Sequence, residues 1–214
     1  MTKEIFFTLL AVLIVGALLW HFRSGFAGES PTTANIDALL RNEATRNGGQ
    51  LIRLENTMWG KVDQQKYDVS YFEVNVNRRP ELLAQLKKKC NGSARQVFYS
   101  SLSFKDSPER ICIIKSQDPY DIIRVMGTDG TNYDINNEQI IKKLKEWDER
   151  YGIIIKGADG DWVDVQFKVM PSDMKKFAEE VYVFCPDAVE QNAGSIEALV
   201  VEMNKYHGVF LWWD

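Results

Sequence analysis

Hydrophobic and polar positions follow two periods along this chain, and each period predicts one kind of element. Apolar residues three and four positions apart predict helices over residues 36–46, 80–90, 120–126, 137–151, 171–185 and 196–207. Alternating or continuous apolar runs predict strands over residues 50–55, 67–76, 96–104, 110–115, 153–155, 163–169 and 209–213. Together these elements predict an α+β fold with a mixed or antiparallel sheet and packed helices.

The strand patterns also predict which side chains face the core. Residues 111–114 are apolar on both faces, as in a central buried strand. Asp159 and Gly160 fit a hairpin turn, so the strands on either side of them should pair antiparallel. Alternation predicts inner faces at Ser70, Phe72, Val74 and Val76 in one strand, and at Val163, Val165, Phe167 and Val169 in another.

Polar residues and prolines predict where helices begin and end. Asp118 is placed to cap a helix that starts at Pro119, and Asn136 or Asn137 can cap the next one. Pro171 should open a later helix, which must stop near Cys185 because proline follows that cysteine. The inward face of this helix is predicted to carry Met174, Phe177, Ala178, Val181 and Tyr182.

Residues 1–28 predict a membrane anchor. Thr8 is the only polar side chain in residues 5–20, which would form about 24 Å of helix, and Phe22 and Arg23 extend the apolar stretch. A cleaved signal peptide would use residues 25–27, but the arginine and bulky phenylalanines nearby disfavour cleavage. We therefore expect one transmembrane helix through residues 5–22, followed by a linker at residues 29–35.

The rest of the chain is long enough and apolar enough for a core, since 45% of the 214 residues are hydrophobic. We divide it into an N-terminal α+β half, residues 36–117, and a C-terminal α+β half, residues 118–214. The net charge is −4, but residues 78–115 are basic and residues 116–214 are acidic. The lysines at 87–89 complement the dipole of a helix end, so we expect no nucleic-acid partner.

Cysteine and histidine usage disfavours several kinds of chemistry. The three cysteines lack the spacing of a zinc site and allow at most one disulfide. With two histidines, His-based metal sites and Ser-His-Asp chemistry are hard to assemble. We expect no metal and no cofactor.

Cys185, with Asp187 beside it, is the sharpest candidate nucleophile. A helix C-terminus and a carboxylate both raise the pKa of a thiol, whereas reactive thiols need positive surroundings. We therefore expect Cys185 to pack as a small apolar side chain beneath the helix end, and we favour this role over catalysis. We expect Asp187 to hold the loop by accepting hydrogen bonds from backbone N–H groups.

A second candidate is a polar set that follows a buried strand. Its members could bind a cation or a charged ligand, or could serve only as caps and a surface ion pair, which is the interpretation we favour. The set comprises Asp118, Tyr120, Asp121, Arg124, Asn132 and Asp134.

Two adjacent tryptophans, Trp212 and Trp213, must point to opposite faces of the last strand. One should be in the core, and the other either covers a helix or is exposed to a partner. Trp59, Tyr71 and Trp162 could add to an aromatic surface patch.

Residues 118–214 resemble the bacterial domain of unknown function 4253. The resemblance is carried by the Asp118-Pro119-Tyr120-Asp121 run, the loop at 127–134, the motif at 146–152, the Phe184-Cys185-Pro186-Asp187 motif and the terminal Trp212-Trp213-Asp214. It implies no reaction. With the anchor, it implies a single-pass protein of a bacterial inner membrane. The charges near the anchor slightly favour a domain outside the cytoplasm, and the unpaired cysteines favour one inside.

We therefore expect an uncharacterised membrane-anchored protein that binds another protein, as an interaction, immunity or accessory module. The alternative is a hydrolase that uses Asp118, Asp121, Arg124 and Asp187, with or without a metal. The two hypotheses differ in geometry, because the hydrolase requires these side chains to converge on one pocket.

Overall fold

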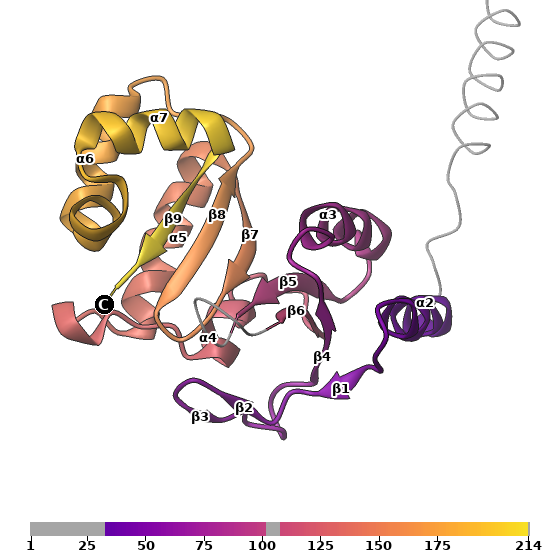
Figure 1. Cartoon of the computed structure of the whole chain (residues 1–214). Coiled ribbons are helices and arrows are strands. Elements are labelled where there is room, and N and C mark those ends of the chain that lie inside the picture. The colour runs from indigo at the N-terminus through magenta and orange to yellow at the C-terminus, as the bar shows by residue number, and fades with distance from the viewer. Residues whose placement is uncertain (1–32, 102–107, 214) are drawn as a thin grey trace, which may run out of the picture.

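The computed structural model describes residues 33–101 and 108–213. They form an α+β fold with one seven-stranded mixed sheet and a separate two-stranded hairpin (Figure 1). The strands are β1 (Ile52–Arg53), β2 (Asn56–Thr57), β3 (Gly60–Lys61), β4 (Val69–Val74), β5 (Gln96–Ser100), β6 (Glu109–Ile114), β7 (Ile153–Ala158), β8 (Trp162–Phe167) and β9 (Gly208–Trp212). The helices are α2 (Thr33–Arg46), α3 (Arg79–Cys90), α4 (Asp121–Met126), α5 (Asn137–Tyr151), α6 (Met174–Phe184) and α7 (Ile196–Tyr206), with short η1 (Thr131–Tyr133) and η2 (Ala188–Ala193).

The sheet consists of two wings that meet at one point. Its order is β1-β4-β6-β5-β7-β8-β9, and every pair is antiparallel except β5 with β7. That parallel pair has a single register position, Tyr99 opposite Gly157. A Cβ at Gly157 would lie 2.4 Å from the Tyr99 ring, so only glycine allows the wings to approach here. The sheet therefore crosses the boundary between residues 117 and 118.

Different helices cover the two faces of the sheet. On one face, α2 and α3 pack over the β4-β6-β5 wing, and Phe72, Leu86 and Ile111 are fully buried between them. On the other face, side chains of α4, α5, α6 and α7 share a core with β7–β9, in which Trp147 contacts Phe177 edge-on. Figure 1 shows α2 and α3 beside the first wing and α6 and α7 beside the second.

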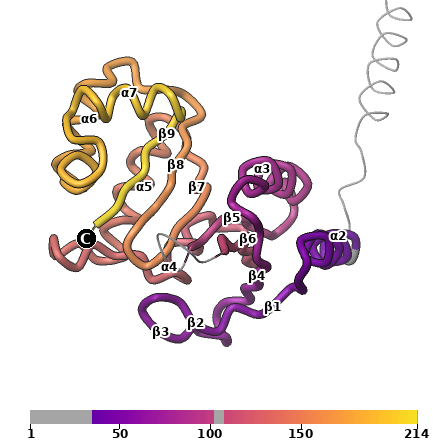
Figure 2. Tube along the Cα trace, in the orientation of Figure 1, coloured from indigo at the N-terminus to yellow at the C-terminus, as the bar shows by residue number. Residues whose placement is uncertain are grey.

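Two polar contacts connect distant parts of the chain. Arg95 is buried and its Nη2 lies 2.7 Å from Asp37 Oδ1, which fixes α2 to the start of β5. The β2–β3 hairpin reaches toward α4 and the β7–β8 turn (Figure 2). At its tip, Trp59 Nε1 donates a hydrogen bond of 2.8 Å to the carbonyl of Gly160. The hairpin thereby connects the two halves of the chain.

Elements with strong local signals form as predicted. The fold class is confirmed, as are the antiparallel β7–β8 hairpin and the central, buried position of β6. Asn136 caps α5, as predicted, in a reciprocal capping box with Gln139. Gly127 ends α4 in the left-handed conformation.

Several predicted boundaries are wrong. The helix after Asp118 begins at Asp121, and Asp118 instead accepts the backbone N–H of Tyr120 in the preceding turn. The later helix begins at Met174 with Asp173 as its cap, because the side chain of Asp173 accepts from the N–H of Lys176. The π-helical η2 was not predicted.

Four apolar side chains also lie elsewhere than predicted. Val76 and Val169 follow the ends of β4 and β8 and are exposed, although the N–H of Val169 still donates to the carbonyl of Tyr151. Tyr182 lies at the edge of the inward face of α6 and is partly exposed, with its hydroxyl bonded to Glu190. Trp162 is buried between the rings of Tyr99 and Phe210 and is not a surface side chain.

The predicted transmembrane helix at residues 5–22 and most of the linker lie outside the described residues. Among the described residues, none of the helices has the length and apolar character that a membrane span requires.

Candidate functional site

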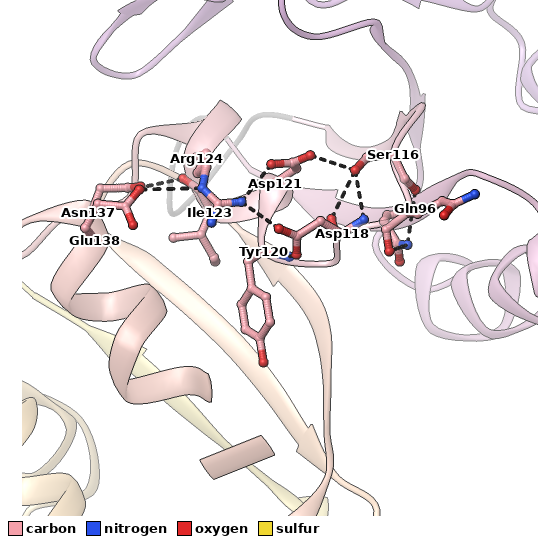
Figure 3. A network of polar contacts seen from close by, with 10 residues as sticks. Gln96, Ser116, Asp118, Tyr120, Asp121, Ile123, Arg124, Asn137 and Glu138 are labelled. Carbon is pink, nitrogen blue, oxygen red and sulfur yellow. Dashed lines mark hydrogen bonds and ion pairs between the residues drawn. The ribbon is translucent and has the colours of Figure 1, made fainter. Parts of the chain in front are cut away.

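Three members of the polar set after β6, Asp118, Asp121 and Arg124, form a network of hydrogen bonds with Ser116 (Figure 3). Arg124 Nη1 donates to Asp118 Oδ2 and to Asp121 Oδ1, both at 2.8 Å. Ser116 Oγ donates to Asp121 Oδ2 at 2.6 Å, and the backbone N–H of Tyr120 donates to Asp118 Oδ1 at 2.9 Å. Every oxygen of the two carboxylates therefore has a donor within the chain.

The charges in this network stabilise one another. Hydrogen bonds to Asp118 and Asp121 raise the pKa of the Arg124 guanidinium. Partial burial alone would raise the pKa of Asp118, but the hydrogen bonds from Arg124 and Tyr120 leave it below its ordinary value. Asp118 is thus held ionised, as an acceptor, and is not prepared to donate a proton.

Tyr120 belongs to the core more than to this network. Its ring points away from the carboxylates (Figure 3) and is 7% exposed, and its hydroxyl lies 3.0 Å from Asp148 Oδ2. Burial and that carboxylate raise the pKa of the phenol. It is therefore not placed to bind a ligand beside Arg124.

Asp187 belongs to a second network. It is 1% exposed, and its Oδ1 accepts from the Tyr133 hydroxyl at 2.7 Å and from Gln191 Nε2 at 2.9 Å. Asn132 and Asp134 are exposed on the loop beside Tyr133, and Asp134 ends η1 in the left-handed conformation with φ 54°. Hydrogen bonds thus join Asp118, Asp121 and Arg124, but place Asp187 in a different cluster.

Cys185 is a buried thiol at the end of α6. Its Sγ donates to the carbonyl of Trp212 at 3.1 Å. Burial raises its pKa to about 12, and Asp187 adds a smaller effect in the same direction. The thiolate needed for nucleophilic attack is therefore scarce at neutral pH.

The terminal tryptophans lie on opposite faces of the sheet. Trp213 is 3% exposed, and its ring meets Phe184 edge-on with the centroids 5.6 Å apart. Trp212 is half-buried against the other core cluster, and its Nε1 lies 3.3 Å from Asp161 Oδ2.

A groove of about 710 Å³ was not predicted from the sequence. It lies between α3, the strands β7–β9 and α7. Its apolar lining includes Leu83, Met203 and Phe210, and its polar lining includes Lys87, Lys156 and Asp164. This combination of a mostly apolar wall with a few grouped charges is typical of ligand pockets.

Lys87 is the most perturbed charged group in the groove. Burial lowers its pKa to about 8, and its Nζ donates to the backbone carbonyl of Ile155 at 2.8 Å. Lys156 is paired instead with Asp164 at 3.1 Å, and Asp164 also accepts from the Tyr99 hydroxyl at 2.8 Å. One sequence signal could have revealed the inward position, because Lys87 follows the buried Leu83 by one helical turn.

Within the described residues, no three His, Cys, Asp or Glu side chains are grouped as a metal site would require. The fold and these sites define an α+β protein with two polar networks paired within the chain and an amphipathic groove.

Residues 110–214 match the family described as Domain of unknown function (DUF4253). The match supports assigning this part of the chain to that domain family and begins eight residues before the resemblance seen in the sequence. Neither the curated proteins nor the solved structures include a match to the chain.

Proposed function

We propose that this chain is a membrane-anchored binding module that recognises another protein, as an immunity or accessory protein does, and that it catalyses no reaction. The observation that carries the proposal is the pairing of Asp118 and Asp121, whose four oxygens all accept hydrogen bonds from within the chain. Carboxylates held in this way stabilise a loop, and a ligand would have to displace those donors.

The hydrolase hypothesis is less well supported, because it needs Asp187 to join the Arg124 cluster. Asp187 is instead buried beneath Tyr133 and Gln191. The remaining nucleophile, Cys185, is fully buried with a raised pKa. These groups lack the mutual geometry of an acid, a base and a nucleophile.

The surface that we propose for the partner lies on α6 and α7. These helices pack against each other, and Val183 and Val201 are 83% and 66% exposed. Exposed apolar side chains on helices that pack together offer apolar surface that a protein interface would bury. The surrounding C-terminal half is acidic, so a partner with basic side chains at the rim is expected.

A site-specific crosslinking experiment tests this proposal. The full chain would carry a photo-reactive residue at position 183, at position 201, or at the exposed control position 73 on β4. We expect one partner to be captured from positions 183 and 201 but not from position 73, and to be captured equally well by the Asp121→Asn variant. Equal capture from all three positions would contradict the proposed surface, and hydrolytic activity lost in Asp121→Asn would favour the enzyme.

The anchor and its orientation need a separate test. We expect the full chain to remain in the membrane fraction after an alkaline carbonate wash. A reporter enzyme that is active only outside the cytoplasm, fused after Asp214, should be active if the domain is outside. Release of the chain by the wash would rule out a transmembrane anchor.

A further inference from the structure

We propose that the groove between α3 and the β7–β9 wing binds a small organic carboxylate, whose anionic group pairs with Lys87 and whose apolar part lies against Leu83 and Phe210. This inference does not depend on the protein partner proposed above, since the groove uses other residues, although α7 contributes to both surfaces. It names a binding site for which the family match assigns no role.

The first argument is an unbalanced charge. No carboxylate of residues 33–101 or 108–213 lies within 4 Å of the Lys87 ammonium, and its hydrogen bond goes to the carbonyl of Ile155. Burying a charged ammonium that has only a neutral acceptor costs free energy, unless an anion pairs with it. A bound carboxylate would supply that anion and a charge-assisted hydrogen bond.

The acidic side chains in the groove have partners of their own. Asp164 is paired with Lys156 and with the Tyr99 hydroxyl, and Glu202 is within hydrogen-bonding distance of Asn192. Arg79 is paired with Glu109, which makes it neutral on balance. Glu202 also lacks a cationic partner among the described residues, but it lies on α7. The positive charge of Lys87 lies on α3, where it complements an anion and repels a cation.

The second argument is the sheet geometry beside Lys87. The wings pair at Tyr99 and Gly157 alone, so Ile155 has no register partner on β5. Lys87 reaches from α3 to the carbonyl of Ile155 and thus takes the position of a strand donor. An ammonium has three N–H donors, and the carbonyl uses one of them, so the others can serve a ligand.

The third argument is the shape of the groove. Leu83 and Met203 are buried lining residues, and Phe210 also lines the groove, with its ring stacked on Trp162 at 5.5 Å between centroids. A volume of about 710 Å³ is within the range of pockets for small organic ligands. The ligand should therefore combine one carboxylate with a flat or short apolar body.

The test uses phenylbutyrate as the probe and phenylbutanol as its neutral counterpart. Binding to the full chain in lipid nanodiscs would be measured by isothermal titration, with empty nanodiscs as the blank. Lys87→Met removes the charge and keeps the apolar stem. Lys88→Met is the matched control, because Lys88 is the next residue of α3 and is exposed.

We expect phenylbutyrate to bind the original chain and Lys88→Met equally, and to bind Lys87→Met at least about tenfold more weakly, as the loss of a charged hydrogen bond implies. Phenylbutanol should bind all three chains alike, and more weakly than phenylbutyrate binds the original chain. Equal binding of phenylbutyrate to Lys87→Met and Lys88→Met would overturn the proposal, as would the absence of saturable binding to the original chain.

A second variant tests the proposal independently, in case Lys87→Met does not fold. Ala84 lines the groove and is exposed, so tryptophan at this position should fill the groove without disturbing the core. Ala84→Trp should retain the circular dichroism spectrum of the original chain and bind neither probe. A folded Ala84→Trp protein that binds phenylbutyrate normally would place the site elsewhere and refute the proposal.

Discussion

Replacing Lys87 with methionine should make the protein more stable at neutral pH, although it removes a hydrogen bond. Burial lowers the pKa of Lys87 from 10.5 to about 8. A tenfold change in an equilibrium corresponds to about 1.4 kcal/mol, so keeping this ammonium charged in the folded protein costs about 3 kcal/mol. Removing the hydrogen bond to Ile155 destabilises the variant by about 1 kcal/mol. The free energy of unfolding of Lys87→Met should therefore be about 2 kcal/mol higher than that of the original chain at pH 7.

The pH dependence gives a sharper test than the stability at a single pH. Between pH 8 and 10.5 the unfolded chain keeps a proton on Lys87 that the folded protein has lost. The free energy of unfolding of the original chain should therefore rise with pH across this window, by up to about 3 kcal/mol. Lys156 and Asp164 face the same ammonium with opposite effects on its pKa, and both are retained in the variant.

Urea unfolding of the full chain in mild detergent, followed by tryptophan fluorescence at several pH values, would measure both effects. Other groups that titrate near pH 10 are common to all variants, so the informative quantity is the difference between Lys87→Met and Lys88→Met. We expect this difference to be about 2 kcal/mol at pH 7 and to shrink above pH 8. A constant difference, or a less stable Lys87→Met at pH 7, would refute the electrostatic account of Lys87.

Four further predictions follow from other contacts. Arg124→Met should lower the free energy of unfolding by about 1–2 kcal/mol, because Asp118 and Asp121 lose their shared donor, and this loss should diminish in acid as Asp118, whose pKa is lowered in the folded protein, is protonated. Trp147→Ala should lower it by about 3–5 kcal/mol in the same assay, since this fully buried ring contacts Phe177 and Phe184. Iodoacetamide at pH 8 should modify none of the three buried cysteines before unfolding and all of them afterwards, as mass spectrometry would show, and early modification would contradict their burial. Deleting residues 208–214 removes β9 and Trp213 and should abolish cooperative unfolding, whereas a truncated chain that stays folded and monomeric would assign those tryptophans to a partner.

The elements that local sequence predicts well are those with a signal inside the element itself. The capping box at Asn136 and the apolar stripe of α5 lie within one helix, so the sequence contains all that defines them. The starts of α4 and α6 were misplaced because Pro119 and Pro171 are compatible with a turn before a helix as well as with its first residue.

The same distinction applies to the candidate sites. Asp118, Asp121 and Arg124 lie within two helical turns of one another, and sequence spacing correctly predicts the pair between Asp121 and Arg124. The groove could not be predicted, since Lys87 finds its acceptor 68 residues away on β7. Nothing in local periodicity indicates that the two wings of the sheet diverge at that point.

At β6, the region matched by the family model and the folded sheet have different limits. The family match begins at residue 110, inside β6, yet both strands that flank β6 lie before that residue. In particular β5, through which β6 is joined to β7, is not part of the match. A fragment of residues 110–214 would leave β6 with both edges unpaired and prone to self-association. A relative that has only the matched region must therefore join β6 to β7–β9 in another way, or borrow the missing strand from another chain.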